Sequence, residues 1–232
     1  MLQNIIFVKD FNNPDVLFMW KKIKKIVFII ILANILFIFW GKFFNPPITF
    51  TQIGGLLQFG KIDRDYISYD EMGSNVKKAV IASEDQAFFV HNGFDYTAIE
   101  KAMKHNEQGK KLRGGSTISQ QTAKNIFLWQ GRSWIRKGLE AVYTFIIELI
   151  WGKDVILERY LNSIEMGRGV FGVEAASEYY FNKHSKDLSK SEAAWIATIL
   201  PNPKKYDPKN PSAYLARKHS WIMRQMNNVN LK

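Results

Sequence analysis

Glu84 and Asp85 are adjacent carboxylates in a segment that also contains Phe88 and His91. The pattern predicts a helix over residues 74–90, with Ser74 as its N-cap and Glu84 at the edge of an apolar face. Partial burial at that position would suit the Glu84 carboxylate to accept a proton near neutral pH. A solvated acid on a helix surface is the alternative interpretation.

A second group of residues is typical of anion binding. Residues 113–115 (Arg-Gly-Gly) precede Ser116, which is expected to cap a helix towards Trp129. Free backbone N–H groups at such a helix start can bind phosphate, and Gln120 and Lys124 would share one face. The pattern predicts a phosphate or diphosphate site, and a flexible loop before a capped surface helix is the alternative. The candidate ligands are Ser116, Thr117, Gln120, Gln121, Lys124 and Arg132.

A third pattern, Arg136-Lys137-Gly138-Leu139-Glu140, opens a helix that Ser133 is expected to cap and Gly152 to end. Arg136 and Glu140 are one turn apart, which is typical of an ordinary helix salt bridge. The functional interpretation is a second carboxylate held by a cation beside a polyanionic substrate. Apolar residues recur at helical spacing, which predicts an amphipathic helix: Ile135, Leu139, Val142, Ile146 and Leu149.

Composition limits the classes of protein and of site. The 232 residues include 32 Lys and Arg against 21 Asp and Glu, so the formal net charge is +11, and 47% are hydrophobic. This balance excludes disorder and favours an anionic partner, such as nucleic acid, anionic lipid or a phosphorylated substrate. Cysteine is absent and the four histidines are far apart, so disulfides, thiolate zinc sites and HExxH sites are excluded. No metal ligands are expected.

The N-terminal part predicts a membrane anchor at residues 26–44. At 1.5 Å per residue this segment spans about 28 Å, close to one hydrocarbon core. Lysines precede it at positions 21, 22, 24 and 25, so the positive-inside rule places a basic segment, residues 1–25, in the cytoplasm. A buried core helix and a cleaved signal peptide are the alternatives, although no small-x-small cleavage site follows. A membrane-proximal linker is expected at 45–60 and the main domain at 61–232.

The main domain is expected to be mainly α. Asp154 marks the start of one helix, and Ser189 with Glu192 forms a capping box for another, which Pro201 stops. Asn210-Pro211 is expected to open a terminal helix. Short apolar stretches near residues 48–69 could be strands, but their alternation is weak.

Five blocks in this order resemble the family 51 glycosyltransferases, which are the peptidoglycan glycosyltransferases. The blocks lie at residues 84–93, 114–125, 136–140, 156–181 and 192–201. The resemblance covers roughly residues 70–225. Because no transpeptidase domain follows, it is to the monofunctional, membrane-anchored form.

The resemblance implies that the chain polymerises lipid II, with inversion at the anomeric carbon and release of polyprenyl diphosphate. It implies Glu84 as the general base, Glu140 as a second catalytic glutamate near the diphosphate, and Lys124 and Arg132 as diphosphate contacts. Its blocks assign further substrate binding to Ser116, Thr117, Gln120, Gln121, Arg136, Lys137, Asp85, Phe88 and His91.

The family's fold and setting are implied in the same way. They comprise a lysozyme-like α-helical domain, a smaller apolar lobe facing the membrane, and a loop at 108–115 that gates the cleft. The implied location is the bacterial inner membrane, with the catalytic domain in the periplasm. The implied partners are lipid II, the nascent glycan strand, the bilayer, and other cell-wall synthesis or division proteins, without nucleic acid. No cofactor is expected as a requirement, and Mg²⁺ is expected at most to assist at the diphosphate.

Two other functions fit part of the pattern. A lytic transglycosylase or lysozyme-like hydrolase could also use two glutamates. A hydrolase has no diphosphate to hold, however, so Gln120, Gln121, Lys124 and Arg132 favour the polymerase. A membrane-anchored scaffold that binds anionic polymer would keep its function after Glu84→Gln, whereas an enzyme would lose it.

Overall fold

The computed structural model describes residues 14–109, 114–131 and 133–231, and the chain divides into two units, Met1–Phe44 and Asn45–Lys232. The first unit contains helix α1 (Pro14–Gly41), which is long and apolar enough to cross a membrane, with a mean hydropathy of 2.3 over its best window. Its one polar residue within the apolar run, Asn34, donates from Nδ2 to the Ile30 carbonyl at 3.1 Å. This bond satisfies the amide within the helix itself, as a lipid environment requires.

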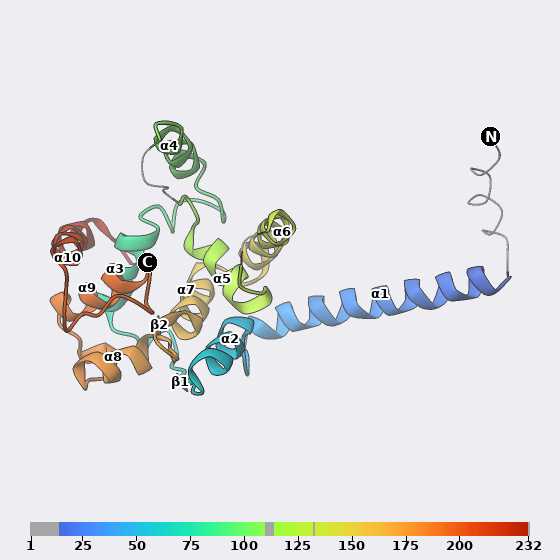
Figure 1. The fold of residues 1–232 in the computed structure, drawn as a ribbon, viewed down its shortest axis with the longest axis horizontal. Coiled ribbons are helices and arrows are strands. Elements are labelled where there is room, and N and C mark those ends of the chain that lie inside the picture. The colour runs from blue at the N-terminus through green and yellow to red at the C-terminus, as the bar shows by residue number, and fades with distance from the viewer. Residues whose placement is uncertain (1–13, 110–113, 132, 232) are drawn as a thin grey trace. The chain divides into compact units, whose positions relative to one another are not determined.

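The second unit is mainly helical, as the sequence predicts, with one small sheet (Figure 1). Its elements are α2 (Phe50–Phe59), β1 (Asp63–Arg64), α3 (Ser74–Glu84), α4 (Tyr96–Glu107), α5 (Ile118–Phe127), α6 (Trp134–Ile150), α7 (Lys153–Ser163), β2 (Glu165–Gly167), β3 (Val170–Phe171), α8 (Val173–Phe181), η1 (Ser185–Asp187), α9 (Lys190–Ile199), α10 (Ala213–Gln225) and η2 (Met226–Asn228).

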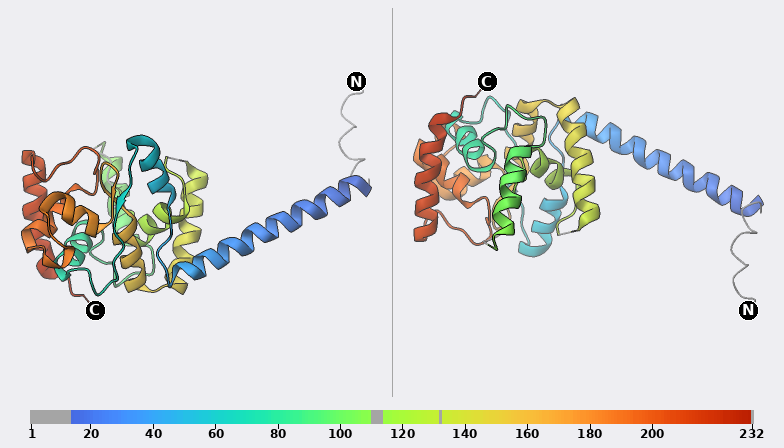
Figure 2. Two further views of the ribbon diagram at one scale, coloured as in Figure 1. Left: turned by 90° about the horizontal axis from the view of Figure 1, so that it is seen from below. Right: turned by 90° about the horizontal axis from the view of Figure 1, so that it is seen from above.

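Two groups of helices form this unit. Helix α5 packs against α6, α7 and α2, whereas α9 packs against α3 and α10. Figures 1 and 2 show α6 and α10 at opposite ends, with α3 and α5 between them, and α4 stands apart from both groups. The core between the groups includes the fully buried side chains of Phe88, Tyr160 and Phe171.

The segment expected as a linker contains a folded helix. Thr49 and Gln52 form a capping box at the start of α2, and the Thr51 hydroxyl donates to the Asn125 carbonyl of α5 at 3.2 Å. A Cβ atom added at Gly55 would lie 2.5 Å from the ring of Phe171 on β3. Helix α2 therefore lies directly on the sheet, whose strand order is β1-β3-β2. The suggestion of strands near 48–69 is wrong except for the two residues of β1.

Several predicted helix ends are wrong by a few residues. Helix α3 ends at Glu84 instead of continuing to residue 90, and its N-cap is Gly73. The N-cap of α5 is Thr117, because its hydroxyl accepts from the Gln120 N–H while the Gln120 side chain accepts from the Thr117 N–H. The N-cap of α10 is Ser212 instead of Asn210, and its hydroxyl accepts from the Leu215 N–H. The caps at Ser133 and Ser189, with their hydrogen bonds, are confirmed.

Helix α6 presents its polar side to the protein. The predicted apolar stripe faces outwards, and Ile135 and Leu149 are 75% and 76% exposed. The buried positions are Arg136, Glu140, Thr144 and Ile147. Helical periodicity detects an apolar stripe, but it does not determine whether that stripe meets protein or another apolar medium.

Candidate active site

Glu84 lies half-buried at the C-terminal end of α3. Its Oε1 accepts a hydrogen bond from the Ser83 hydroxyl at 3.0 Å, and its Oε2 accepts one from Gln121 Nε2 at 3.1 Å. Tyr160 of α7 donates its hydroxyl to Gln121 Oε1 at 3.0 Å. Burial, with the charges of Glu84 and Asp85, raises the pKa of Tyr160 well above its usual value. Tyr160 therefore stays protonated and orients the Gln121 amide so that its NH₂ group faces Glu84.

Asp85 and His91 connect the end of α3 to the start of α5. The buried Asp85 carboxylate accepts from the Ile118 N–H at 2.9 Å and lies 2.9 and 3.0 Å from His91 Nε2. His91 Nδ1 accepts from the Gly93 N–H at 3.1 Å, so a neutral ring carries its proton on Nε2 and donates it to Asp85. Together with the fully buried Phe88, these two side chains hold the end of α3 against the start of α5.

Two of the predicted ligands at the start of α5, Thr117 and Gln120, serve the structure of the helix itself. The Thr117 hydroxyl donates to the Gly93 carbonyl at 2.6 Å, and both Thr117 and Gln120 are committed to the capping box. Ser116 is exposed and accepts a hydrogen bond from Lys137 Nζ at 3.3 Å. The hydroxyl of Ser116 and the ammonium of Lys137 are therefore accessible to a bound molecule.

Glu140 is the centre of a cationic group on α6. Its buried carboxylate accepts from Arg136 at 2.7 Å and forms a second ion pair with Lys137. Arg136 Nε is buried without a hydrogen-bond partner in the described structure. Arg136 and Lys137 are paired with the single carboxylate of Glu140, and Lys124 is within electrostatic range of all three. The group therefore carries an excess of positive charge that suits an anion.

Lys124 on α5 is influenced by the charges of both glutamates. Burial lowers the pKa of Lys124, Glu140 and Glu84 oppose that shift, and Arg136 and Lys137 add to it. No hydrogen bond or ion pair of its ammonium occurs among the described residues. Such a lysine can bind the phosphate of a ligand.

Lys218 on α10 is a site residue that the sequence analysis missed. It is half-buried, which lowers the pKa of Lys218, and the charge of Glu84 opposes that shift. Lys218 therefore lies within electrostatic range of the carboxylate that Gln121 binds. Nothing in the spacing of a C-terminal helix relates this lysine to Glu84, and only the packing of α10 on α3 brings them together.

The predicted residue Arg132, and residues 110–113 of the predicted gating loop, lie outside the described residues. In the part of the chain that is described, no three His, Asp or Glu side chains form a group that could hold a metal ion. The structure brings the remaining predicted residues into two groups that meet at α5. Glu84 is hydrogen-bonded to Gln121 of α5, and the ion-paired group of Glu140 on α6 contacts Ser116, just before α5, through Lys137.

Comparison with known proteins gives one consistent result. A transglycosylase family model matches residues 52–227. The chain is 54% identical over 171 residues to a biosynthetic peptidoglycan transglycosylase of Mannheimia succiniciproducens, covering 74% of this chain and 70% of the relative. It is 46% identical over 221 residues to the Haemophilus influenzae protein of that name, covering 90% and 89%. The Bacteroides thetaiotaomicron protein of that name is 47% identical over 201 residues, covering 86% and 81%.

Proposed function

We propose that this chain, which belongs to the transglycosylase family, polymerises lipid II into linear peptidoglycan glycan strands. In each cycle the 4-hydroxyl of one sugar attacks the anomeric carbon at the end of the growing strand. The configuration of that carbon inverts, and polyprenyl diphosphate leaves. The observation that carries this proposal is the ion-paired cationic group around Glu140 on α6, the helix that packs against α5, whose Gln121 binds Glu84. A lytic enzyme or a hydrolase would need the carboxylates but not the cations.

Glu84 is proposed as the general base. The carboxylate takes the proton of the attacking hydroxyl while the oxygen forms its bond to the anomeric carbon. The neutral donors Ser83 and Gln121 orient the carboxylate without pairing it with a cation. Glu84 is therefore positioned to act as the base.

The cationic group is proposed to stabilise the leaving diphosphate. Negative charge develops on the diphosphate as the glycosidic bond breaks, and fixed cations lower the energy of that transition state. Lys124, Arg136 and Lys137 supply the charge, with Ser116 as a neutral donor and Arg132 as a further cation. Glu140 holds Arg136 and Lys137 in place through its two ion pairs. The proposed chemistry requires no cofactor, and Mg²⁺ remains at most an assistant at the diphosphate.

The remaining predicted residues are proposed as the frame of the site. Asp85, Phe88 and His91 fix the end of α3 below Glu84, and Thr117 and Gln120 fix the start of α5. Gln121 touches both the frame and Glu84.

The proposed setting is the bacterial inner membrane. Helix α1 would cross it once with the lysine-rich end in the cytoplasm, which places the catalytic domain in the periplasm. The outward apolar face of α6 would contact the bilayer surface, where both lipid-linked substrates lie. Contact with other cell-wall synthesis or division proteins belongs to the same proposal, and nucleic acid is not proposed as a partner.

The test is incubation of the purified full-length chain with labelled lipid II, followed by separation of the products on a gel. A ladder of glycan strands, absent with Glu84→Gln, is the expected result. Fragments released from finished peptidoglycan, without any polymer from lipid II, would replace the proposal with a lytic activity. Polymer formation at the normal rate by Glu84→Gln would remove Glu84 from its role.

A further inference from the structure

A buried carboxylate of α6 that the proposed chemistry does not use joins three helices. Glu148 Oε1 accepts a hydrogen bond from the Ser119 hydroxyl of α5 at 2.5 Å and one from Lys153 Nζ of α7 at 2.6 Å. Ser119 is fully buried, and the Glu148 side chain is only 9% exposed. One oxygen atom therefore connects α5, α6 and α7.

The same cluster reaches the segment that follows α3. Lys153 Nζ lies 4.6 Å from the centroid of the fully buried Phe88 ring, within the range of a cation–π contact. A Cβ atom added at Gly93 would lie 3.0 Å from Glu148 Cγ, so this segment packs against α6 at Glu148. The cluster thus joins α5, α6, α7 and the segment that follows α3.

Burial of apolar side chains against the protein does not account for the rotation of α6 about its axis. The exposed face carries Phe145 and Leu149, whereas the protein-facing side carries Glu140, Thr144 and Glu148 at intervals of one turn. Burial of apolar area against protein alone would favour the opposite rotation of this helix. Contact of the outer face with a bilayer would favour the observed side, but a broad apolar face does not set the exact angle. The polar contacts on the inner side can set that angle, because buried ion pairs can specify one arrangement.

We propose that Glu148 is a positioning residue that fixes the rotation of α6 and so holds Glu140 and its two cations towards Lys124. Glu148 lies two turns from Glu140 on the same face and needs no contact with substrate. A rotation of about 20° moves a side-chain end by roughly 2 Å at the radius of a helix. A displacement of about 1 Å can reduce a rate about 100-fold. The proposal rests on the proposed role of the Glu140 group.

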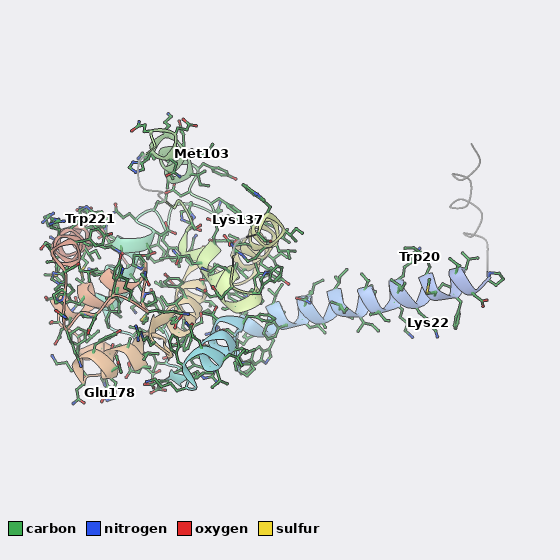
Figure 3. The ribbon with its side chains drawn as sticks, in the orientation of Figure 1. Trp20, Lys22, Met103, Lys137, Glu178 and Trp221 are labelled. Atoms are coloured by element: carbon green, nitrogen blue, oxygen red, sulfur yellow. The ribbon has the colours of Figure 1, made fainter. Side chains whose placement is uncertain are left out.

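The test measures the rotation of α6 and the rate separately. Because the chain has no cysteine, spin labels can be placed by Val142→Cys on α6 and Glu178→Cys on α8, both at exposed positions. Figure 3 shows Glu178 far from Lys137, which marks α6. The distance distribution between the labels is measured in the otherwise unchanged protein, in Glu148→Gln and in the milder Ser119→Ala, all well below their melting temperatures.

Glu148→Gln is expected to shift or broaden the label distance and to lower the polymerisation kcat by at least about 10-fold in fully folded protein. Lys153→Met is expected to do the same, whereas Lys153→Arg keeps the ion pair and most of the rate. Glu100→Gln is the matched control, because it removes an exposed ion pair with Lys104 on α4, and it should change neither reading.

Unchanged label distances in Glu148→Gln, Lys153→Met and Ser119→Ala would overturn the proposal. Shifted labels with an unchanged kcat would also overturn it, because the rotation would then not affect the site. If the unaltered chain does not polymerise lipid II, the function proposed above is wrong, and the label distances still decide whether Glu148 fixes the helix.

Discussion

The two glutamates of the proposed site differ in how their charge is balanced. Among the described residues, Glu84 accepts hydrogen bonds from a hydroxyl and an amide, whereas Glu140 is paired with two cations. A carboxylate held by neutral donors can accept a proton, while one held by cations is better suited to orient them. The different surroundings explain why two residues of one type can have two roles.

At the residue scale, the burial of Lys124 predicts that the rate of polymerisation depends on pH. Burial is the largest influence on its pKa and lowers it from 10.5, so Lys124 loses its charge at a lower pH than an exposed lysine does. If that charge stabilises the diphosphate, kcat/KM should fall on the alkaline side below pH 10.5. Lys124→Arg should move this fall to higher pH, because arginine keeps its charge there.

The measurement for Lys124 is the pH profile of kcat/KM for the unaltered chain and for Lys124→Arg. Lys124→Met serves as the control without a charge, and it should lose about 100-fold or more at every pH. Alkaline limbs that coincide in the unaltered chain and the arginine variant would remove Lys124 as their cause.

At the scale of elements, helix caps can be predicted from the sequence more readily than the packing of the helices can. Capping boxes are local in sequence, so Ser189 with Glu192 and the cap at Ser133 could be predicted from the residues alone. The end of α3 at Glu84 could not, because Asp85 leaves the helix to bind Ile118 and His91, which belong to other segments. The same holds for α2, whose place on the sheet depends on Phe171.

Helix α2 allows a prediction with adjacent glycines. A Cβ at Gly55 would lie 2.5 Å from the buried Phe171 ring, whereas one at Gly54 would meet nothing within 4 Å. Gly55→Ala should lower the free energy of unfolding by about 1–3 kcal/mol through overpacking. Gly54→Ala should raise it by about 0.5–1 kcal/mol, because alanine favours the helix.

Thermal and denaturant unfolding of the two glycine variants in the same detergent measures the difference. Equal effects of the two substitutions would contradict the packing of α2 on the sheet. Such a result would favour the interpretation of this segment as a linker, which is what the sequence suggests.

At the scale of the whole molecule, a basic chain carries two apolar surfaces that lack cover among the described residues. One is α1, with only 6% of its most apolar window buried, and the other is the outer face of α6. The face of α6 includes Trp134 at 92% exposure and Phe145 at 63%. Apolar surfaces of this kind mark contact with membrane or protein, and a lipid-linked substrate makes the membrane the expected contact.

An environment-sensitive fluorophore can test the membrane contact of α6. The fluorophore is attached at Leu149→Cys in the full-length chain, which is then placed in vesicles. Its emission should lie at shorter wavelength than that of the same fluorophore attached to a soluble thiol in buffer without detergent. Attached at Glu178→Cys on α8, it should report water, since Glu178 is an exposed polar residue outside the α6 face. Emission typical of water at both positions would exclude insertion of α6 into the bilayer.

The sequence by itself determined the long apolar N-terminal helix, the order of the motif blocks, most helices and the candidate residues, because these depend on local composition, spacing and capping. Only the tertiary structure decided which side of α6 faces the protein, that Asp85 binds the start of α5, and that α10 packs on α3. These features depend on contacts between segments far apart in the chain. Periodicity along one helix records which side is apolar, and only packing against the other helices determines what that side meets.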